Sequence, residues 1–506
     1  MAWTSEKKHT IQHALILLSL SALVLVVLGR STTVDVDFWG YIAFGRLFWH
    51  SNSFPYQDIF TYLPTTGQWI YHEWLTGTIL YPIYTFAGDP GVIILRDLVA
   101  LATLAFLYLA ARIRKSHRAS ALFWLVLISG FLGMGYWAVV RAQTFTYLFT
   151  ALTIYVLERS RWKGQRSLLL ILVPIQIIWC NMHGGFLAGL GIAFLYLIGD
   201  AFSHRTYWPY LPVLLLLVLS SLANPYGVDY WTYLFHAITL PRRDITEWAS
   251  ILTAYQTHTM SLSLIFYYMF IGIFSLRMLF WWNWQEITPI LVLSVTFLLG
   301  LEHVRHQVFF LMVTAVYLPG LIQPYIKDLQ ARSTSLGARL RQNLSAVFLR
   351  STRMTRAFIT AVPILLFCVI LGSSSFSLMI PSYQKGVIIY YPTGALEYIR
   401  RNHLSGNILT EFMWGEYLIW NLGPRMKVAL DGRYETVYQG HVANQYFDYM
   451  KGKEKEFLDT YAHDMVLFKP DSPPVDSIRS NPDWKGVYED MGSILFMKAR
   501  TPMPSL

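Results

Sequence analysis

Acidic, histidine and arginine side chains recur in the short polar segments that separate the long apolar stretches of this chain. Carboxylates can act as general bases, arginine matches phosphate oxygens, and histidine can bind ligands or move protons. Because such groups are costly in apolar surroundings unless they pair or bind a ligand, we expect them to line one polar cavity. The candidates are Asp35, Asp37, Asp58, His72, Glu73, Arg141, His183, Arg305 and His306.

Four of these residues also have purely structural interpretations. Asp37 stands just before Trp39, where a helix is expected to begin, and aspartate is a favoured cap. Asp58 follows a proline and a tyrosine, as turn residues often do. His183 could pack at a close helix contact beside two glycines, and Arg141 could reach toward lipid headgroups. The other acids and the histidine in the first polar segment favour chemistry for Asp37.

The composition indicates an integral membrane protein. Of the 506 residues, 54% are hydrophobic and 14% are charged, whereas soluble proteins carry about 25% charged residues. The net charge of +10 belongs to residues 1–380, because residues 381–506 hold 14 basic and 15 acidic side chains. The positive charge is therefore expected to set membrane orientation, and nucleic acid is not expected as a partner.

The apolar stretches predict an α-helical polytopic membrane protein with about 11 transmembrane helices. Lysine and arginine concentrate in alternate loops, which places the N-terminus in the cytoplasm and the C-terminal part outside. The expected helices cover residues 11–29, 91–111, 120–139, 144–158, 168–182, 186–202, 209–223, 261–277, 287–302, 307–325 and 357–379. The candidate residues then all lie at the outer face.

The first outer loop, residues 30–90, is long and aromatic. Its segment 74–86 contains Pro82 and is short for a crossing, and counting it as one would invert every later loop. We expect this segment, and a second at residues 39–49, to form juxtamembrane helices at the outer face. Long structured loops are usually functional, so the site is expected here.

Residues 381–506 alternate short apolar runs with charged helices, which predicts a small soluble α/β domain after the membrane module of residues 1–380. Within it, the segment Asp431-Gly432-Arg433 follows an expected strand. It is either a turn with an internal ion pair or a part of the domain that binds an acceptor or caps the membrane cavity.

The sequence resembles the GT-C superfamily of membrane glycosyltransferases, in a poorly characterised bacterial branch. The first helix is followed by the acidic motif VDVDFWGYIAFGRLFW, then by FPYQDIFTY and WIYHEWL. Later outer turns carry RAQTF, NMHGGF, NPYG, ITEWAS and EHVRHQVFF, and the C-terminal part carries GEYLIW and KVALDGRYETVY. The likeness covers nearly the whole chain. The WWD-type motif of oligosaccharyltransferases is missing, so asparagine glycosylation is not expected.

The resemblance implies an active site on the periplasmic side of the inner membrane and a polyprenyl-phosphate-linked sugar as donor. It matches Asp37 to the catalytic base and Glu73 to a second acidic position, with His72 beside it. It also assigns the donor phosphate to arginine or histidine at later outer turns. The substrate-binding candidates are Asp35, His72, Arg141, His183, Arg305 and His306.

These parts predict an inverting transfer in which Asp37 deprotonates the acceptor hydroxyl. The departing lipid phosphate would be stabilised by arginine, or by a divalent cation (Mg or Mn) held by Asp58 and Glu73. Two other functions stay open: a transporter or flippase of lipid-linked saccharides, and a non-enzymatic membrane assembly protein. Transporters usually place ionisable groups near mid-membrane in repeated halves, and this sequence shows neither feature.

Overall fold

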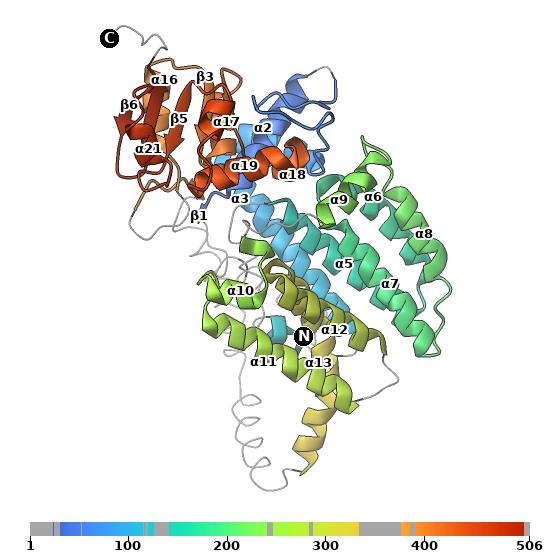
Figure 1. Ribbon diagram of the computed structural model, residues 1–506. Coiled ribbons are helices and arrows are strands. Elements are labelled where there is room, and N and C mark those ends of the chain that lie inside the picture. Colours follow the sequence, from blue (N-terminus) through green and yellow to red (C-terminus); the bar gives the residue numbers. More distant parts are fainter. Residues whose placement is uncertain are drawn as a thin grey trace, which may run out of the picture.

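The computed structural model describes residues 31–51, 53–114, 120–125, 141–239, 246–282, 287–332, 376–384 and 390–499, with Val24 and Ser116. The expected helix at 11–29 lies outside these residues apart from Val24, and so do most of those at 120–139 and 357–379. Figure 1 shows a body of long helices beside a domain that contains a β-sheet.

Long apolar helices form the body. Two of them, α7 (Phe186–Phe202) and α12 (Ile287–Glu302), have the bounds that the sequence predicts. The others are α3 (Trp74–Ile113), α5 (Ala142–Lys163), α6 (Leu172–Met182) after the 3-10 helix η1 (Arg166–Ile171), α8 (Tyr210–Ser220), α11 (Leu262–Trp282) and α13 (Gln307–Arg332). Among the described residues, α3 alone is long and apolar enough to cross a membrane, and several helices of 10–17 residues are strongly apolar. The count of 11 crossings stays a prediction.

Helix α3 contains a break at Gly88, whose φ of 58° and ψ of −153° are not helical. This φ lies in the left-handed region that favours glycine, and Pro90 follows two residues later. The break separates the first part of α3 from the apolar helix that starts near residue 91. The two segments expected at 74–86 and 91–111 thus lie on either side of this break. That the first is a juxtamembrane helix and the second a crossing stays a prediction.

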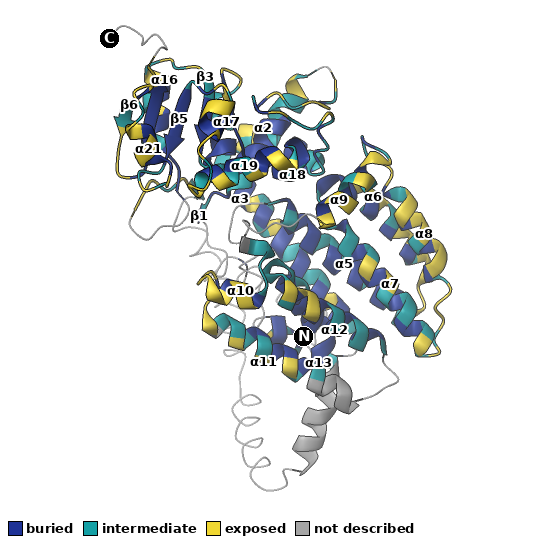
Figure 2. Cartoon of the chain, viewed as in Figure 1, coloured by how far each residue is buried: buried dark blue, intermediate teal, exposed yellow. Residues whose placement is uncertain are grey.

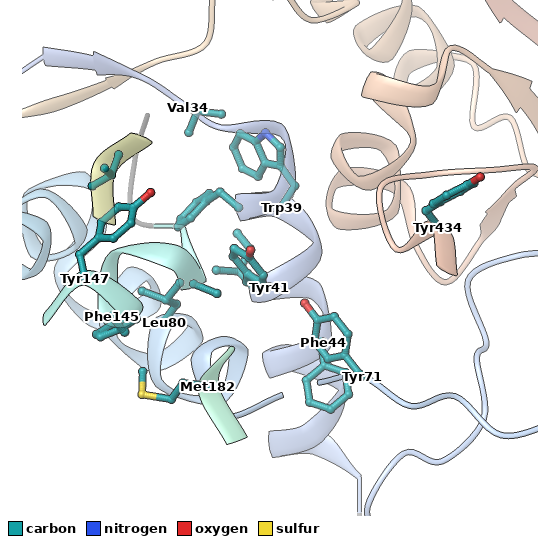
Figure 3. Close-up of a cluster of buried hydrophobic side chains, with 14 of the residues drawn as sticks. Val34, Trp39, Tyr41, Phe44, Tyr71, Leu80, Phe145, Tyr147, Met182 and Tyr434 are labelled. Atoms are coloured by element: carbon teal, nitrogen blue, oxygen red, sulfur yellow. The ribbon is translucent and has the colours of Figure 1, made fainter. Parts of the chain in front are cut away.

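Helix α2 (Val36–His50) is the second expected juxtamembrane helix, and it begins three residues earlier than predicted. The structural interpretation of Asp37 as the cap is wrong, because Asp35 is the cap residue and accepts the Asp37 N–H at 3.1 Å. Helix α2 packs closely on α3: a Cβ on Gly45 would lie 2.3 Å from the carbonyl oxygen of Gly77. Figure 3 shows buried hydrophobic side chains of this region, among them Trp39, Tyr41 and Phe44 of α2 and Leu80 of α3.

The C-terminal part is the expected α/β fold. Its sheet has the strand order β4-β3-β5-β7-β6, in which β4, β3 and β5 are parallel and β7 is antiparallel to both neighbours. The strands are β3 (Gly406–Thr410), β4 (Met426–Val428), β5 (Met465–Phe468), β6 (Trp484–Glu489) and β7 (Ile494–Lys498). The helices are α16 (Thr393–Arg401), α17 (Gly415–Leu422), α18 (Tyr434–Val437), α19 (Gly440–Met450), α20 (Phe457–Thr460) and α21 (Val475–Arg479). Two short strands, β1 (Ser31–Thr33) and β2 (Ser377–Met379), pair in parallel near the membrane body.

The first outer loop continues the sheet beyond β4. Thr61 pairs with Val428 in parallel, and the Phe60 carbonyl accepts the Val428 N–H at 2.9 Å. Farther along, the Thr66 N–H donates to the Val437 carbonyl at 2.8 Å. Buried side chains form one continuous cluster that runs from α3 through α2 into the sheet (Figure 2). The loop, α2 and the C-terminal domain therefore form one packed unit above the helical body.

Candidate active site

Arg141 is the centre of a partly buried charge cluster. Its Nε lies 3.2 Å from Asp35 Oδ1, and its Nη2 lies 2.7 Å from Asp37 Oδ2. Its Nη1 lies 2.6 Å from Glu247 Oε1. Each donor nitrogen of this guanidinium thus faces a different carboxylate. The structure brings Asp35, Asp37 and Arg141 together, as the sequence analysis expected.

Helix ends position these groups. Asp35 and Asp37 occupy the cap and the first turn of α2, where carboxylates interact well with the helix dipole. Arg141 is the residue that precedes α5. Glu247 lies in a short 3-10 helix, η2 (Thr246–Trp248), between the long helices. Because three elements from distant parts of the sequence converge, the cluster forms only when α2, α5 and η2 are packed.

The three carboxylates do not share one environment. Burial raises the pKa of Asp35 to about 7, although Arg141 opposes this shift. For Glu247, burial is outweighed by the attraction of Arg141 and Arg305, which lowers its pKa to about 2. The side chain of Asp37 is 28% exposed, against 8% for Asp35. Asp37 is therefore the carboxylate of the α2 pair that a substrate can reach more easily.

A second cluster surrounds Glu73, which precedes α3. Its Oε1 lies 3.7 Å from His72 Nε2 and 3.6 Å from His183 Nε2. Burial raises the pKa of Glu73 to about 8, and the negative charge of Asp37 adds to this shift. At neutral pH this carboxyl is mostly protonated and can donate a hydrogen bond. The sequence analysis expected these three residues in the site, and the structure brings them together.

His183 is held in one orientation by its neighbours. Its Nδ1 accepts the Gly185 N–H at 2.9 Å and also contacts the Thr146 hydroxyl at 2.8 Å. The Trp179 indole N–H donates to the same hydroxyl oxygen at 2.8 Å. Since Nδ1 accepts, the ring proton of neutral His183 sits on Nε2 and faces Glu73. Burial and the charge of Arg305 hold the pKa of His183 well below its usual value.

Arg305 belongs to a third group, in the 3-10 helix η3 (Val304–His306) between α12 and α13. Its guanidinium carbon lies 4.6 Å from the centre of the Trp248 ring, and the His306 ring lies 6.0 Å from the same ring. In the part of the chain that the structure describes, no carboxylate is ion-paired with Arg305. Its positive charge nevertheless acts on Glu73 and Glu247, so Arg305 lies near both acids.

Asp58 lies apart from these groups, at the contact with the C-terminal domain. Its Oδ1 is ion-paired with Arg433, and its Oδ2 accepts the N–H groups of Phe60 and Thr61 at 3.0 and 2.8 Å. Arg433 also binds Asp431, with Nε 2.7 Å from Oδ1 and Nη2 2.6 Å from Oδ2. The segment Asp431-Gly432-Arg433 is thus a turn with an internal ion pair, and it also fastens the domain to the first loop.

The two tentative cation ligands are not brought together as a metal site. Both oxygens of Asp58 are taken by Arg433 and by backbone amides, whereas Glu73 is flanked by histidines. Within the described ranges, no three histidine, cysteine, aspartate or glutamate side chains are arranged to hold a metal ion. The side chains present therefore do not fit the expected cation.

The sequence analysis gave two residues of the site no role. Glu247, in the segment ITEWAS, is one of the ionisable groups expected in an outer loop, whereas Glu416, in GEYLIW, was not singled out. Glu416 belongs to the C-terminal domain, and its carboxyl accepts the N–H of Gly40 on α2 at 3.1 Å. The only available signal was that each is an acid within a segment typical of the suspected branch. The segment around Arg242 and Arg243 lies outside the described residues.

Comparisons with known proteins place this arrangement in context. No profile of a known family matches the sequence, and no curated protein matches it either. Among solved structures, the oligosaccharyltransferase of Archaeoglobus fulgidus, tethered with an acceptor peptide that contains the NVT sequon, is similar with a TM-score of 0.55. The sequences are 12% identical, and the match covers 97% of this chain and 74% of that one.

The second matched protein is ArnT from Cupriavidus metallidurans. Its structure bound to undecaprenyl phosphate gives a TM-score of 0.53 at 11% identity, and its apo structure gives 0.52 at 13% identity. Both matches cover 97% of this chain and 98% of the other. Identity this low speaks for a shared fold. Both kinds of matched protein are membrane glycosyltransferases of one superfamily.

Proposed function

Because the chain has the fold of the GT-C membrane glycosyltransferases, we propose that it transfers a sugar from a polyprenyl-phosphate donor to an acceptor hydroxyl at the outer face of the inner membrane. The observation that carries the proposal is that a partly exposed carboxylate, Asp37, and a separate arginine, Arg305, lie near the same buried acid, Glu73. No described carboxylate is ion-paired with Arg305. Such a site offers a base at one side and an anion-binding group at the other.

Asp37 is the base in this proposal. Arg141 Nη2 lies 2.7 Å from its Oδ2, and Asp37 stands in the first turn of α2, so the carboxylate is held in place. It takes the proton of the acceptor hydroxyl as the oxygen attacks the anomeric carbon. General-base assistance of this kind contributes roughly 10²–10⁴-fold. Direct displacement by one nucleophile predicts inversion at that carbon.

Arg305 stabilises the departing lipid phosphate. Its guanidinium lies on the Trp248 ring, which fixes the plane of the fork without consuming its charge. We assign Arg141 a different role from the one expected from the sequence. A phosphate at Arg141 would have to displace a carboxylate at 2.6–3.2 Å, so Arg141 organises the acids and Arg305 receives the anion.

Glu73, His72 and His183 hold the sugar between these groups. A mostly protonated Glu73 donates a hydrogen bond, as does the Nε2–H of His183, and sugar hydroxyls and ring oxygens accept such bonds. Asp35 has a mainly structural role as the cap of α2. No step is routed through a divalent cation, since the carboxylates of Asp58 and Glu73 do not converge.

The test uses purified protein with a panel of polyprenyl-phosphate sugars, and the measurement is release of polyprenyl phosphate, with and without EDTA. We expect release by the wild-type protein in both conditions, and a loss of at least about 100-fold in Asp37→Asn. Asp476→Asn, which changes an exposed aspartate of α21, is the matched control and should keep full activity. Full activity of Asp37→Asn would remove Asp37 from the reaction.

A further inference from the structure

A carboxyl group of the C-terminal domain reaches the backbone of α2 beside Asp37. Glu416 lies in the first turn of α17 and is 5% exposed. Its Oε2 accepts the Gly40 N–H at 3.1 Å, a contact between residues 376 positions apart in the sequence. This contact places an acid of the C-terminal domain, Glu416, near the proposed base, Asp37.

Two glycines make room for this carboxyl. A Cβ on Gly40 would lie 2.4 Å from Glu416 Oε2. A Cβ on Gly432, in the loop after β4, would lie 2.9 Å from Glu416 Oε1 and 3.2 Å from Asp37 Oδ1. The carboxylates of Asp37 and Glu416 therefore face the same small space. Glycine on α2 and glycine in the loop after β4 both leave this space free of other side chains.

The cations near this pair are already engaged. Arg141 holds Asp37, and Arg433 is bound by Asp431 and Asp58. Burial raises the pKa of Glu416 well above its usual range, and the charges of Asp37 and Asp431 add to the shift, while Arg433 and the Gly40 N–H oppose it. The titratable groups that face Glu416 are Asp37 of α2, Tyr71 of the first loop, Tyr391 before α16, and Asp431 and Arg433 after β4.

The balance of charges around the site favours a neutral Glu416. Five acids lie around this part of the structure, Asp35, Asp37, Glu73, Glu247 and Glu416, together with Arg141 and Arg305. A third arginine, Arg433, is already bound by Asp431 and Asp58. If all five were ionised, the site would repel an anionic donor. A site that needs both an ionised base and a bound phosphate must keep some of its other acids neutral.

We propose that Glu416 is a positioning residue that stays protonated at neutral pH, so that the negative charge of the pair rests on Asp37 and the lipid phosphate can bind beside it. This inference rests on the proposed function. It also makes the C-terminal domain part of the active site, because α17 carries the acid and the loop after β4 encloses it.

The first measurement is binding of undecaprenyl phosphate to the full-length protein between pH 6 and pH 9. Glu416→Gln keeps the size and the hydrogen-bonding acceptor of the acid but cannot ionise. We expect equal affinity of variant and wild type at pH 6. At pH 9 the wild type should bind at least about threefold more weakly than the variant, because an ionised Glu416 repels the phosphate. Taking the ratio of the two proteins cancels the titration of Asp35 and Glu73.

The second measurement is the melting temperature over the same range, without lipid. A carboxyl with a raised pKa binds more protons in the folded state, so its contribution to stability falls as pH rises from its unfolded pKa toward its folded pKa. Glu416→Gln removes this loss. The melting temperature of the variant minus that of the wild type should be about 2–4 °C larger at pH 8 than at pH 5.

Glu397→Gln is the matched control, because Glu397 is exposed on α16 and pairs only with Arg401 four residues later. It should follow the wild type in both measurements. If Glu416→Gln does not fold, Glu416→Met provides an uncharged side chain of similar length. Superimposable pH profiles of wild type and the uncharged variant would overturn the inference. If the wild type binds no undecaprenyl phosphate at any pH while the melting profiles still diverge, the proposed function fails and the protonated state of Glu416 stands.

Discussion

Replacement of Arg141 by glutamine tests the central charge cluster. The substitution removes the partner of three carboxylates at 2.6–3.2 Å while keeping a polar side chain of similar length. Their side chains are 8%, 28% and 35% exposed for Asp35, Asp37 and Glu247, so water screens them only in part. Removing one partner of a buried ion pair costs about 3–5 kcal/mol. We take the lower value, about 3 kcal/mol, because Asp37 and Glu247 retain some solvent.

The pKa shifts determine how the stability deficit of Arg141→Gln changes with pH. Arg141 lowers the pKa of Glu247 to about 2 and opposes the burial that raises the pKa of Asp35 to about 7. The stability that the lowered pKa of Glu247 provides is present above its unfolded value and is lost as pH falls toward 2. Without Arg141, the carboxylates repel one another most strongly when they are ionised. The deficit of Arg141→Gln should therefore be largest near pH 8 and shrink toward pH 4.

Melting temperatures between pH 4 and pH 8 measure this deficit. At pH 8 we expect Arg141→Gln to melt roughly 5 °C or more below the wild type. Arg479→Gln is the control, because Arg479 pairs with Glu489 at the exposed edge of the sheet, where ion pairs contribute about 0–1 kcal/mol. A variant as stable as the wild type at pH 8, or a deficit that does not change with pH, would refute the electrostatic reasoning.

Two further substitutions separate binding from structure. Arg305→Gln should weaken undecaprenyl phosphate binding and lower transfer by about 100-fold. Its melting temperature should fall less than that of Arg141→Gln, because the guanidinium lies on Trp248 and is ion-paired with no described carboxylate. Normal lipid binding would contradict the assignment of Arg305 as the group that binds the phosphate. Asp58→Asn should lower the free energy of unfolding by about 3 kcal/mol, because Arg433 loses a buried partner. The folded fraction should keep its kcat. A stable variant without activity would instead indicate that Asp58 takes part in the reaction.

The sequence predicts the helical body well because length and apolar composition determine it. Helices α7 and α12 match the expected bounds, and the separate segments expected at 74–86 and 91–111 lie on either side of the break in α3. The short helices α9 (Asp229–Thr239) and α10 (Ile251–Gln256) were not predicted. They mix polar and apolar residues over few turns, so local periodicity does not distinguish them from loops.

The sequence indicated which residues lie close together in the candidate site better than it indicated which of them form ion pairs. Residue type indicated that Asp37, Glu73 and Arg305 belong to it. It could not indicate that Arg141 is already held by three carboxylates, since the partners come from segments about 100 residues away on either side. The contact of Glu416 with α2 depends on how the C-terminal domain packs, and no local pattern encodes that distance.

The pairing of Asp58 with Arg433 has a consequence for biosynthesis. The two residues are 375 positions apart, and Thr61 is 367 positions from Val428, with which it pairs at the edge of the sheet. At roughly 5–20 residues per second, a ribosome needs about 20–75 s to travel from one to the other. Throughout that interval the nascent chain carries an acid without its cation and a loop without its sheet. A chain cut short by a premature stop stays in that condition, which makes its outer face a recognisable substrate for proteolytic quality control.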